Sequence, residues 1–176
     1  MDNAIIALAK KVKILILDVD GVLTDGRLQF NHDGEFIKTF HAHDGLGIKL
    51  LLKTGVDVAL ITARVSPLVT YRAQMLGIKH IYQGQEDKIP TYEKLLSELH
   101  LTHDNVAYVG DDLNDIPLLR RVALPISVAN ARPQVQAEAK WVTKLAGGHG
   151  AVREICDGLM EAQGTWENVL AEYTSR

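Results

Sequence analysis

Short apolar runs alternate with amphipathic segments along most of the chain. The first run, residues 13–17, ends abruptly in acidic residues and glycine, which is typical of a parallel strand buried on both faces. Similar runs predict strands at residues 58–61, 80–82, 106–109 and 124–128, and apolar residues at helical spacing predict helices at 47–53, 67–76, 89–99, 116–121, 133–139 and 151–162. This alternation predicts an α/β fold with a doubly wound parallel sheet.

One stretch interrupts the alternation. Residues 27–31 and 35–40 have the pattern of two strands, joined at 32–34 by His-Asp-Gly, a turn signal of β-hairpins. The predicted hairpin, about residues 27–40, is inserted between the first strand and its helix. An isolated hairpin is marginally stable in water, and this one has apolar residues to bury: Leu28, Phe30, Phe36 and Phe40. We therefore expect it to pack against other copies of the chain in a homo-oligomer.

Length, charge and cysteine content narrow the classes of function. The chain has 176 residues, which fits one domain spanning 1–176. Its formal net charge of -3, with both signs mixed, provides no basic surface for nucleic acid. The single cysteine, Cys156, cannot form an internal disulfide, and the apolar stretch 4–9 is too short to cross a membrane and predicts a short packing helix. We expect a cytoplasmic protein with no nucleic-acid or membrane partner.

Polar residues lie where four of the predicted strands end. In open parallel sheets, ligands bind beyond the carboxyl ends of the strands, so these residues are candidates for a functional site. They are Asp18 and Asp20 after the first strand, Thr62 and Arg64 after the second, Lys88 at the start of the helix after the third, and Asp111, Asp112 and Asp115 after the fourth. The fold thus predicts that they meet at one edge of the sheet.

Gathering five carboxylates is electrostatically unfavourable. Two unit charges about 4 Å apart repel each other by roughly 4 kcal/mol at an effective dielectric constant near 20. Lys88 supplies one compensating charge, and a ligand set made only of oxygen indicates a hard cation, for which Mg²⁺ is the expected ion. His41 and His43 would suit a transition metal, but they belong to the insertion and not to a strand end.

The residue types at this edge predict phosphoryl transfer through a covalent intermediate. A carboxylate held near a metal is an adequate nucleophile towards phosphorus, and Asp18 is the candidate. Asp20 is the candidate acid for the leaving oxygen and the candidate base for the attacking water, provided that the chain turns at Gly21. We expect Thr62 and Lys88 to bind phosphoryl oxygens and offset developing charge.

The remaining carboxylates are assigned to the metal and its surroundings. Asp111 is expected to complete the set of metal ligands. Asp112 and Asp115 are expected to orient either the metal or Lys88.

In their order along the chain, these residues resemble the four motifs of the haloacid dehalogenase superfamily. The matching segments, spread over nearly the whole chain, are Asp18-x-Asp20-Gly21-Val22, Thr62, Lys88 and Gly110-Asp111-Asp112-x-x-Asp115. The resemblance implies a Rossmann-like core and a Mg²⁺ ion held by Asp18, the backbone carbonyl of Asp20, and Asp111. The large cap domain of many such enzymes has no room here, because residues 63–87 already form a helix and a strand.

Longer segments are similar to the family of phosphatases acting on 3-deoxy-D-manno-octulosonate (KDO) 8-phosphate. These segments are 18–26, 62–64 and 147–154. The similarity implies a homotetramer that hydrolyses a small phosphorylated acidic sugar in bacterial lipopolysaccharide biosynthesis. It also implies substrate contacts from Asp20, His41, Ala42, His43, Asp44, Gly45, Lys49, Arg64, Arg72 and Lys88. A related nonulosonate 9-phosphate or another sugar phosphate is an alternative substrate.

A phospho-receiver signalling domain is the alternative from another class of function. Receivers also gather aspartates, a threonine and a lysine around Mg²⁺ at the edge of a parallel sheet. In a receiver, however, the acidic pair follows the first strand and the phosphorylated aspartate follows the third. Here Asp111 and Asp112 follow the fourth apolar run, which disfavours this alternative.

Two segments near the C-terminus have no predicted chemical role. The glycine-rich run 147–150 predicts a mobile connector before the helix at 151–162. Residues 164–176 predict either a docked tail or a segment that reaches the site of a neighbouring copy.

Overall fold

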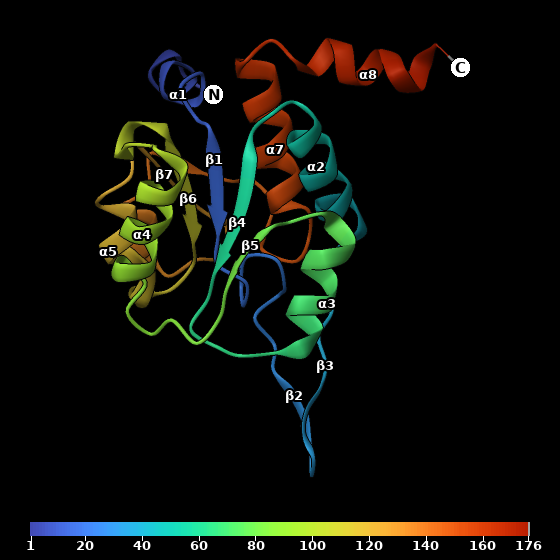
Figure 1. Cartoon of the computed structure of the whole chain (residues 1–176), viewed down its shortest axis with the longest axis vertical. Helices are drawn as coiled ribbons and strands as arrows, with labels where there is room; N and C mark the ends of the chain where they lie inside the picture. The colour runs from blue at the N-terminus through green and yellow to red at the C-terminus, as the bar shows by residue number, and fades with distance from the viewer. Residues whose placement is uncertain (176) are drawn as a thin grey trace.

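A six-stranded parallel sheet forms the centre of the computed structural model, which describes residues 1–175 (Figure 1). The strand β1 is central, because it pairs in parallel with both β4 and β6. Every residue of β1 is buried, as a strand covered on both faces requires. Across the sheet the strands are β5 (His80–Tyr82), β4 (Asp57–Ile61), β1 (Ile14–Leu17), β6 (Val106–Gly110), β7 (Leu124–Ser127) and β8 (Trp141–Val142).

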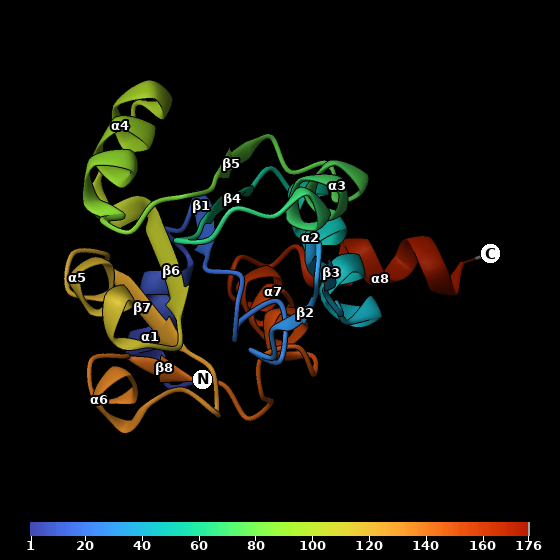
Figure 2. The same ribbon diagram turned by 90° about the horizontal axis from the view of Figure 1, so that it is seen from below.

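Helices cover both faces of this sheet, which confirms the predicted doubly wound fold (Figure 2). One face is covered by α2 (Ala42–Lys53), α3 (Pro67–Leu76) and α7 (Ala151–Ala162), and the other by α4 (Ile89–Leu99), α5 (Ile116–Leu119) and α6 (Pro133–Gln136). Two 3₁₀ turns, η1 (His103–Asn105) and η2 (Leu113–Asp115), flank β6. Within residues 1–175, no helix has both the length and the apolar character needed to cross a bilayer.

The largest differences from the predicted elements lie near the chain ends and at α2. This helix begins at Ala42 and not at residue 47, after His41 in an extended conformation. The N-terminal segment forms the predicted short helix, α1 (Asn3–Ala9), whereas the predicted tail contains a helix, α8 (Trp166–Thr174). Both α1 and α8 lie at the end of the molecule opposite the hairpin (Figure 1). Arg176, the last residue of the predicted tail and domain, is outside the described residues.

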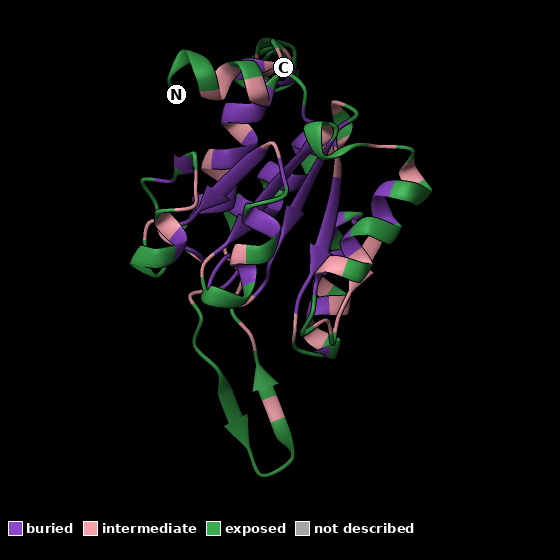
Figure 3. Cartoon of the chain, turned by 90° about the vertical axis from the view of Figure 1, so that its left-hand side faces the viewer, coloured by how far each residue is buried: buried purple, intermediate pink, exposed green. Residues whose placement is uncertain are grey.

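The predicted hairpin is present and projects beyond the carboxyl ends of the parallel strands (Figure 1). Its strands, β2 (Gln29–Asn31) and β3 (Gly34–Ile37), are shorter than the predicted 27–31 and 35–40, and their register shifts between Gln29 and Phe30. Most of the hairpin is exposed (Figure 3), including the side chains of Phe30 and Phe36. Among residues 1–175 this hairpin is the insertion between β1 and α2, and there is no large cap domain.

The glycine-rich loop before α7 packs directly against the loop that follows β1. The Gly148 amide donates to the carbonyl of Val22 at 3.0 Å, and the Gly147 amide donates to Oδ1 of Asn130 at 2.8 Å. A Cβ atom at Gly147 would overlap the carbonyl oxygen of Gly21. The pattern predicts a mobile connector here, but the structure instead shows a support for the loop after β1 that requires close approach of two backbones.

Gly147→Ala should therefore destabilise the fold, because the new methyl group has no space against Gly21. We expect a loss of about 3 kcal/mol in the free energy of unfolding, at the upper end for overpacking. Gly77→Ala is the control, since nothing lies within 4 Å of its Cβ position and the expected cost is only that of a left-handed backbone, about 1–2 kcal/mol. Urea denaturation of both variants measures the difference. Equal losses would contradict the close-packing account.

Candidate active site

The loop after β1 turns tightly and places Asp18 at the edge of the sheet. The Asp18 amide still donates to Val109 in β6, at 3.0 Å, so the residue continues the ladder of β1. The chain then turns, with the carbonyl of Val19 accepting from the amides of residues 22, 23 and 24. Gly21 has a φ of 91°, and a Cβ atom there would overlap the Asp111 carboxylate. Glycine at position 21 thus permits both the turn and the close approach of the loop backbone to the Asp111 carboxylate.

Lys88 links three elements of the sheet edge through a buried ammonium group. Its Nζ atom donates to Oδ1 of Asp18 at 2.8 Å, to Oδ1 of Asp115 at 2.6 Å and to the Tyr108 hydroxyl at 3.0 Å. The lysine side chain is only 1% exposed. Burial acts to lower the pKa of Lys88, but the Asp18 and Asp115 carboxylates outweigh it, so the pKa is raised. The ammonium is therefore charged, and all three of its protons are used.

Asp115 is completely buried and has every carboxylate lone pair engaged. Its Oδ1 atom accepts from Lys88 and from the Tyr108 hydroxyl, the latter at 2.6 Å. Its Oδ2 atom accepts from the backbone amides of Asp111 and Asp112, at 2.9 and 3.2 Å. Asp115 therefore holds both Lys88 and the start of η2 in place. Asp112 instead caps η2, accepting from the Leu113 amide at 2.8 Å, and makes no hydrogen bond to Lys88.

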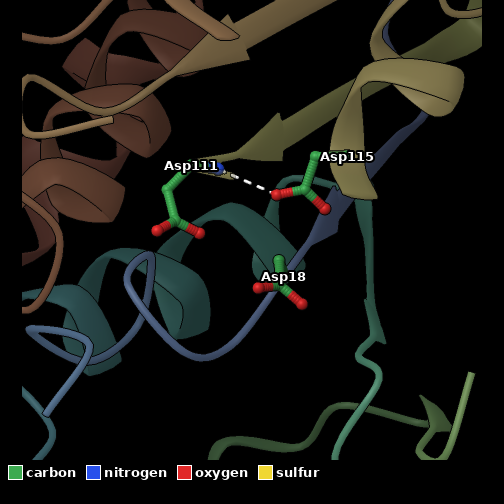
Figure 4. Close-up of side chains that lie close together, drawn as sticks. All are labelled: Asp18, Asp111 and Asp115. Carbon is green, nitrogen blue, oxygen red and sulfur yellow. Dashed lines mark hydrogen bonds between the residues drawn. The ribbon is translucent and has the colours of Figure 1, made fainter. Parts of the chain in front are cut away.

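Asp18, Asp111 and Asp115 each place an oxygen within 4.8 Å of the others (Figure 4). Burial raises the pKa of Asp18 to about 6, although Lys88 counteracts it. Burial, reinforced by the charges of Asp18 and Asp115, raises the pKa of Asp111 to about 8. When all three carboxylates are ionised, as metal ligands must be, they carry more negative charge than Lys88 offsets.

This excess of charge and the all-oxygen donor set fit a hard divalent cation such as Mg²⁺. Because both oxygens of Asp115 are already hydrogen-bonded, the carboxylates able to hold the ion are those of Asp18 and Asp111. Oδ1 of Asp18 accepts a single hydrogen bond from Lys88, so the Asp18 carboxylate keeps lone pairs free for a ligand.

An open cavity of about 220 Å³ lies beside these carboxylates. Of the predicted catalytic residues, Asp18, Asp20 and Thr62 line it, while Lys88 lies behind Asp18. The full lining consists of Asp18, Asp20, Gly26, Leu28, Thr62, Ala63, Arg64, Asp111, Asp112 and Asn114. The cavity is therefore polar around the carboxylates, and Leu28 lines it from the base of the hairpin.

The structure separates the predicted substrate residues into two groups. Arg64 lines the cavity, and its Nε atom lies 3.8 Å from Oδ2 of Asp20. Arg72, His41, Asp44 and Gly45 instead line a separate, smaller space of about 10 Å³. That space contains polar atoms without a hydrogen-bond partner: Nε of Arg72, Nδ1 of His41 and Oδ2 of Asp44. Three more predicted residues, Ala42, His43 and Lys49, are exposed on α2.

Two contributors to this region were not predicted as site residues. Lys38, at the end of β3, makes a short ion pair with Asp20. Asn114 lines the cavity from η2. The motif spacing places Asn114 at this strand end. Lys38 lies on a predicted hairpin, where a lysine is ordinarily solvated, so no sequence signal marks it.

Comparison with known proteins places this geometry in a family. Residues 61–155 match the family model described as haloacid dehalogenase-like hydrolase. The chain is 48% identical over 160 residues to the 3-deoxy-D-manno-octulosonate 8-phosphate phosphatase KdsC of Escherichia coli (strain K12), covering 91% of this chain and 85% of that protein.

Solved structures agree with the sequence match. A probable YrbI family phosphatase from Pseudomonas syringae has a TM-score of 0.96 and 47% identity, with 98% of each chain covered. The 3-deoxy-D-manno-octulosonate 8-phosphate phosphatase of Moraxella catarrhalis, in complex with magnesium ion, phosphate ion and KDO, has a TM-score of 0.96 and 39% identity, covering 99% of this chain and 100% of that one. The chain therefore belongs to the haloacid dehalogenase-like hydrolases, in the branch that contains these phosphatases.

Proposed function

We propose that this chain is a Mg²⁺-dependent phosphatase that hydrolyses KDO 8-phosphate to KDO and inorganic phosphate, in the cytoplasm, as a step of lipopolysaccharide biosynthesis. The observation that supports the reaction type best is the buried Asp18, bound to Lys88 and facing Asp111 beside a cavity. The choice of substrate is supported by the 48% identity to the Escherichia coli phosphatase. We further propose that residues 1–176 form one catalytic domain, since one sheet supplies every motif.

In the first half of the proposed reaction, Asp18 attacks the phosphorus atom. Lys88 holds Oδ1 of Asp18, so the other carboxylate oxygen is the one that forms the new bond. The bond from phosphorus to the sugar oxygen breaks, and Asp20 gives a proton to that oxygen. Thr62, which lines the cavity, and the amides of the loop after β1 can donate to the phosphoryl oxygens.

In the second half, water replaces Asp18 on phosphorus. Asp20, now a carboxylate, takes a proton from the water as its oxygen attacks, and the bond to Asp18 breaks. We propose that the carboxylates of Asp18 and Asp111 and the backbone carbonyl of Asp20 would hold Mg²⁺, which would offset the charge of the phosphate dianion. The free carboxylate of Asp18 is regenerated beside Lys88, and inorganic phosphate leaves.

Recognition of the sugar is assigned to two sets of residues. Arg64 lines the cavity and can pair with an acidic group of the substrate. We propose that Arg72, Lys49 and the segment 41–45 act at a pocket completed by neighbouring copies of the chain, because within one chain they do not line the cavity. The exposed apolar residues of the hairpin support this assembly, which we propose is a homotetramer.

A nonulosonate 9-phosphate is the second candidate substrate, because it has the same acidic sugar character that Arg64 could recognise. A receiver domain is disfavoured by the match to a hydrolase family and by the position of Asp111 after β6.

The function is tested by a phosphate-release screen across sugar phosphates. We expect the highest kcat/KM on KDO 8-phosphate, and a loss of about 10⁴-fold or more in Asp18→Asn, which lacks the nucleophile. Asp104→Asn is the matched control, since Asp104 is exposed at the amino end of β6. A better substrate without an acidic group would reject the proposed sugar class, and near-normal release by Asp18→Asn would reject the covalent mechanism.

Chelation should stop the reaction, and excess Mg²⁺ should restore it. Without the ion, the carboxylates of Asp18 and Asp111 would repel the phosphate dianion. Binding of the ion to the folded state alone should also raise the melting temperature. The measurements are phosphate release and thermal unfolding after exhaustive dialysis against chelator. Unchanged activity in the metal-free protein would contradict the magnesium site.

The hairpin should be required for assembly. Phe30 and Phe36 are 54% and 55% exposed, so a Phe30→Ser, Phe36→Ser double variant should lose apolar contacts between copies and sediment as a smaller species. Val142→Ser, at another exposed apolar residue, is the control. Sedimentation velocity and phosphate release are measured on the same samples. A fully active monomer would contradict a shared pocket.

A further inference from the structure

The side chain of Lys38 is buried although the residue lies on an exposed hairpin. It directly follows β3, whose Phe36 and Ile37 are largely exposed, yet only 1% of the Lys38 side chain is accessible. Its ammonium group is paired with Oδ1 of Asp20 and lies 3.1 Å from Oε1 of Glu35. The side chains of Asp20 and Glu35 are themselves 17% and 12% exposed. The contact therefore lies at the base of the hairpin, shielded from solvent.

A buried ammonium group is retained only where charged partners replace water. Removing such a charge from water costs several kcal/mol, and this cost is offset only by well-placed carboxylates. Asp20 and Glu35 supply two of them from different segments of the chain. Because the charge of Glu35 offsets that of the ammonium group, Lys38 adds little net charge at the cavity. Its main effect is to fix the orientation of the Asp20 carboxylate.

The pairing leaves the two oxygens of Asp20 in different environments. Oδ1 is held by Lys38, whereas Oδ2 lies 3.8 Å from Nε of Arg64. Both Asp20 and Arg64 line the cavity beside Asp18, and Lys38 does not. Lys38 thus reaches the reaction only through Asp20.

We propose that Lys38 is a positioning residue that fixes Oδ1 of Asp20, so that Oδ2 is the oxygen that transfers protons in the reaction. The proposal rests on the proposed phosphatase function. Oδ2 gives its proton to the sugar oxygen as the bond from that oxygen to phosphorus breaks. It later regains a proton from water as the water oxygen bonds to phosphorus and Asp18 leaves, so the carboxyl group ends each cycle as it began. Loss of orientation at a proton-transfer group typically lowers the rate of that step.

The dependence on the leaving group distinguishes positioning from a general structural role. A sugar alkoxide needs a proton when it leaves, whereas 4-nitrophenolate leaves readily without one. Lys38→Met should lower kcat on KDO 8-phosphate by about 10²-fold, but kcat on 4-nitrophenyl phosphate by less than about 10-fold. Lys38→Arg, which keeps a cation at this place, should recover part of the loss. Lys94→Met is the control, because Lys94 is 69% exposed on α4.

Two further measurements complete the test. In an Asp20→Asn background, Lys38→Met should have little additional effect, since residues acting as a unit are not additive. The concentration of Mg²⁺ that gives half-maximal activity should stay within about twofold of wild type, because the Asp18 and Asp111 carboxylates are untouched. Circular dichroism and sedimentation verify that each variant folds and assembles like the wild-type protein.

The outcomes separate this proposal from the proposed function. If the wild-type protein does not release phosphate from KDO 8-phosphate or any other sugar phosphate, the proposed function fails. If it does, and Lys38→Met slows both substrates equally or neither, the positioning role is overturned. If Lys38→Met does not fold, the comparison is made with Lys38→Arg alone, where an equal effect on both substrates overturns it as well.

Discussion

The buried ion pairs of Lys88 are the interaction on which the rest of the site depends. An ammonium group that is 1% exposed is tolerable only because Asp18 and Asp115 oppose it and Tyr108 accepts its third proton. These contacts join the end of β1, the start of α4 and the turn η2 after β6. Asp115 continues the network into the backbone of Asp111. The positions of Asp18, Lys88 and Asp111 are therefore fixed together before any ligand binds, which is the preorganisation that the proposed phosphoryl transfer would require.

The topology of the sheet explains why these residues can meet. With β1 between β4 and β6, the loops that follow all three strands open at the same edge, and they supply Asp18, Thr62 and Asp111. Lys88 follows β5, which lies two strands away from β1. The chain then crosses from β5 to β6 through α4 and passes the carboxyl end of β1 on the way. The same crossover that makes the sheet doubly wound thus brings Lys88 to Asp18.

The sequence predicts those parts of the fold and site that depend on local patterns or on which residues follow a strand. Continuous apolar runs identify buried parallel strands, and the residues just after them identify Asp18, Thr62 and Asp111. The strand β8 has two residues, too few for a recognisable pattern of apolar and polar positions. The segment that forms α8 is predicted only as a tail. Burial of Lys38 and the contact between Gly147 and Gly21 arise between distant segments, so neither has a local signal.

The hairpin has two ends with different physical character. Its strands expose Phe36 and part of Phe30, whereas its base is anchored by the pairing of Lys38 with Asp20. The ring of Phe30 also faces Arg64, with 5.5 Å between the ring centroid and Cζ. A displacement of the base would strip the buried ammonium of its partners, at a cost of several kcal/mol. The anchored base therefore restrains two side chains of the cavity wall, Asp20 and Arg64, from outside the sheet. In a chain whose described residues include no large cap domain, this short insertion is thus an outside restraint on two residues of the proposed site.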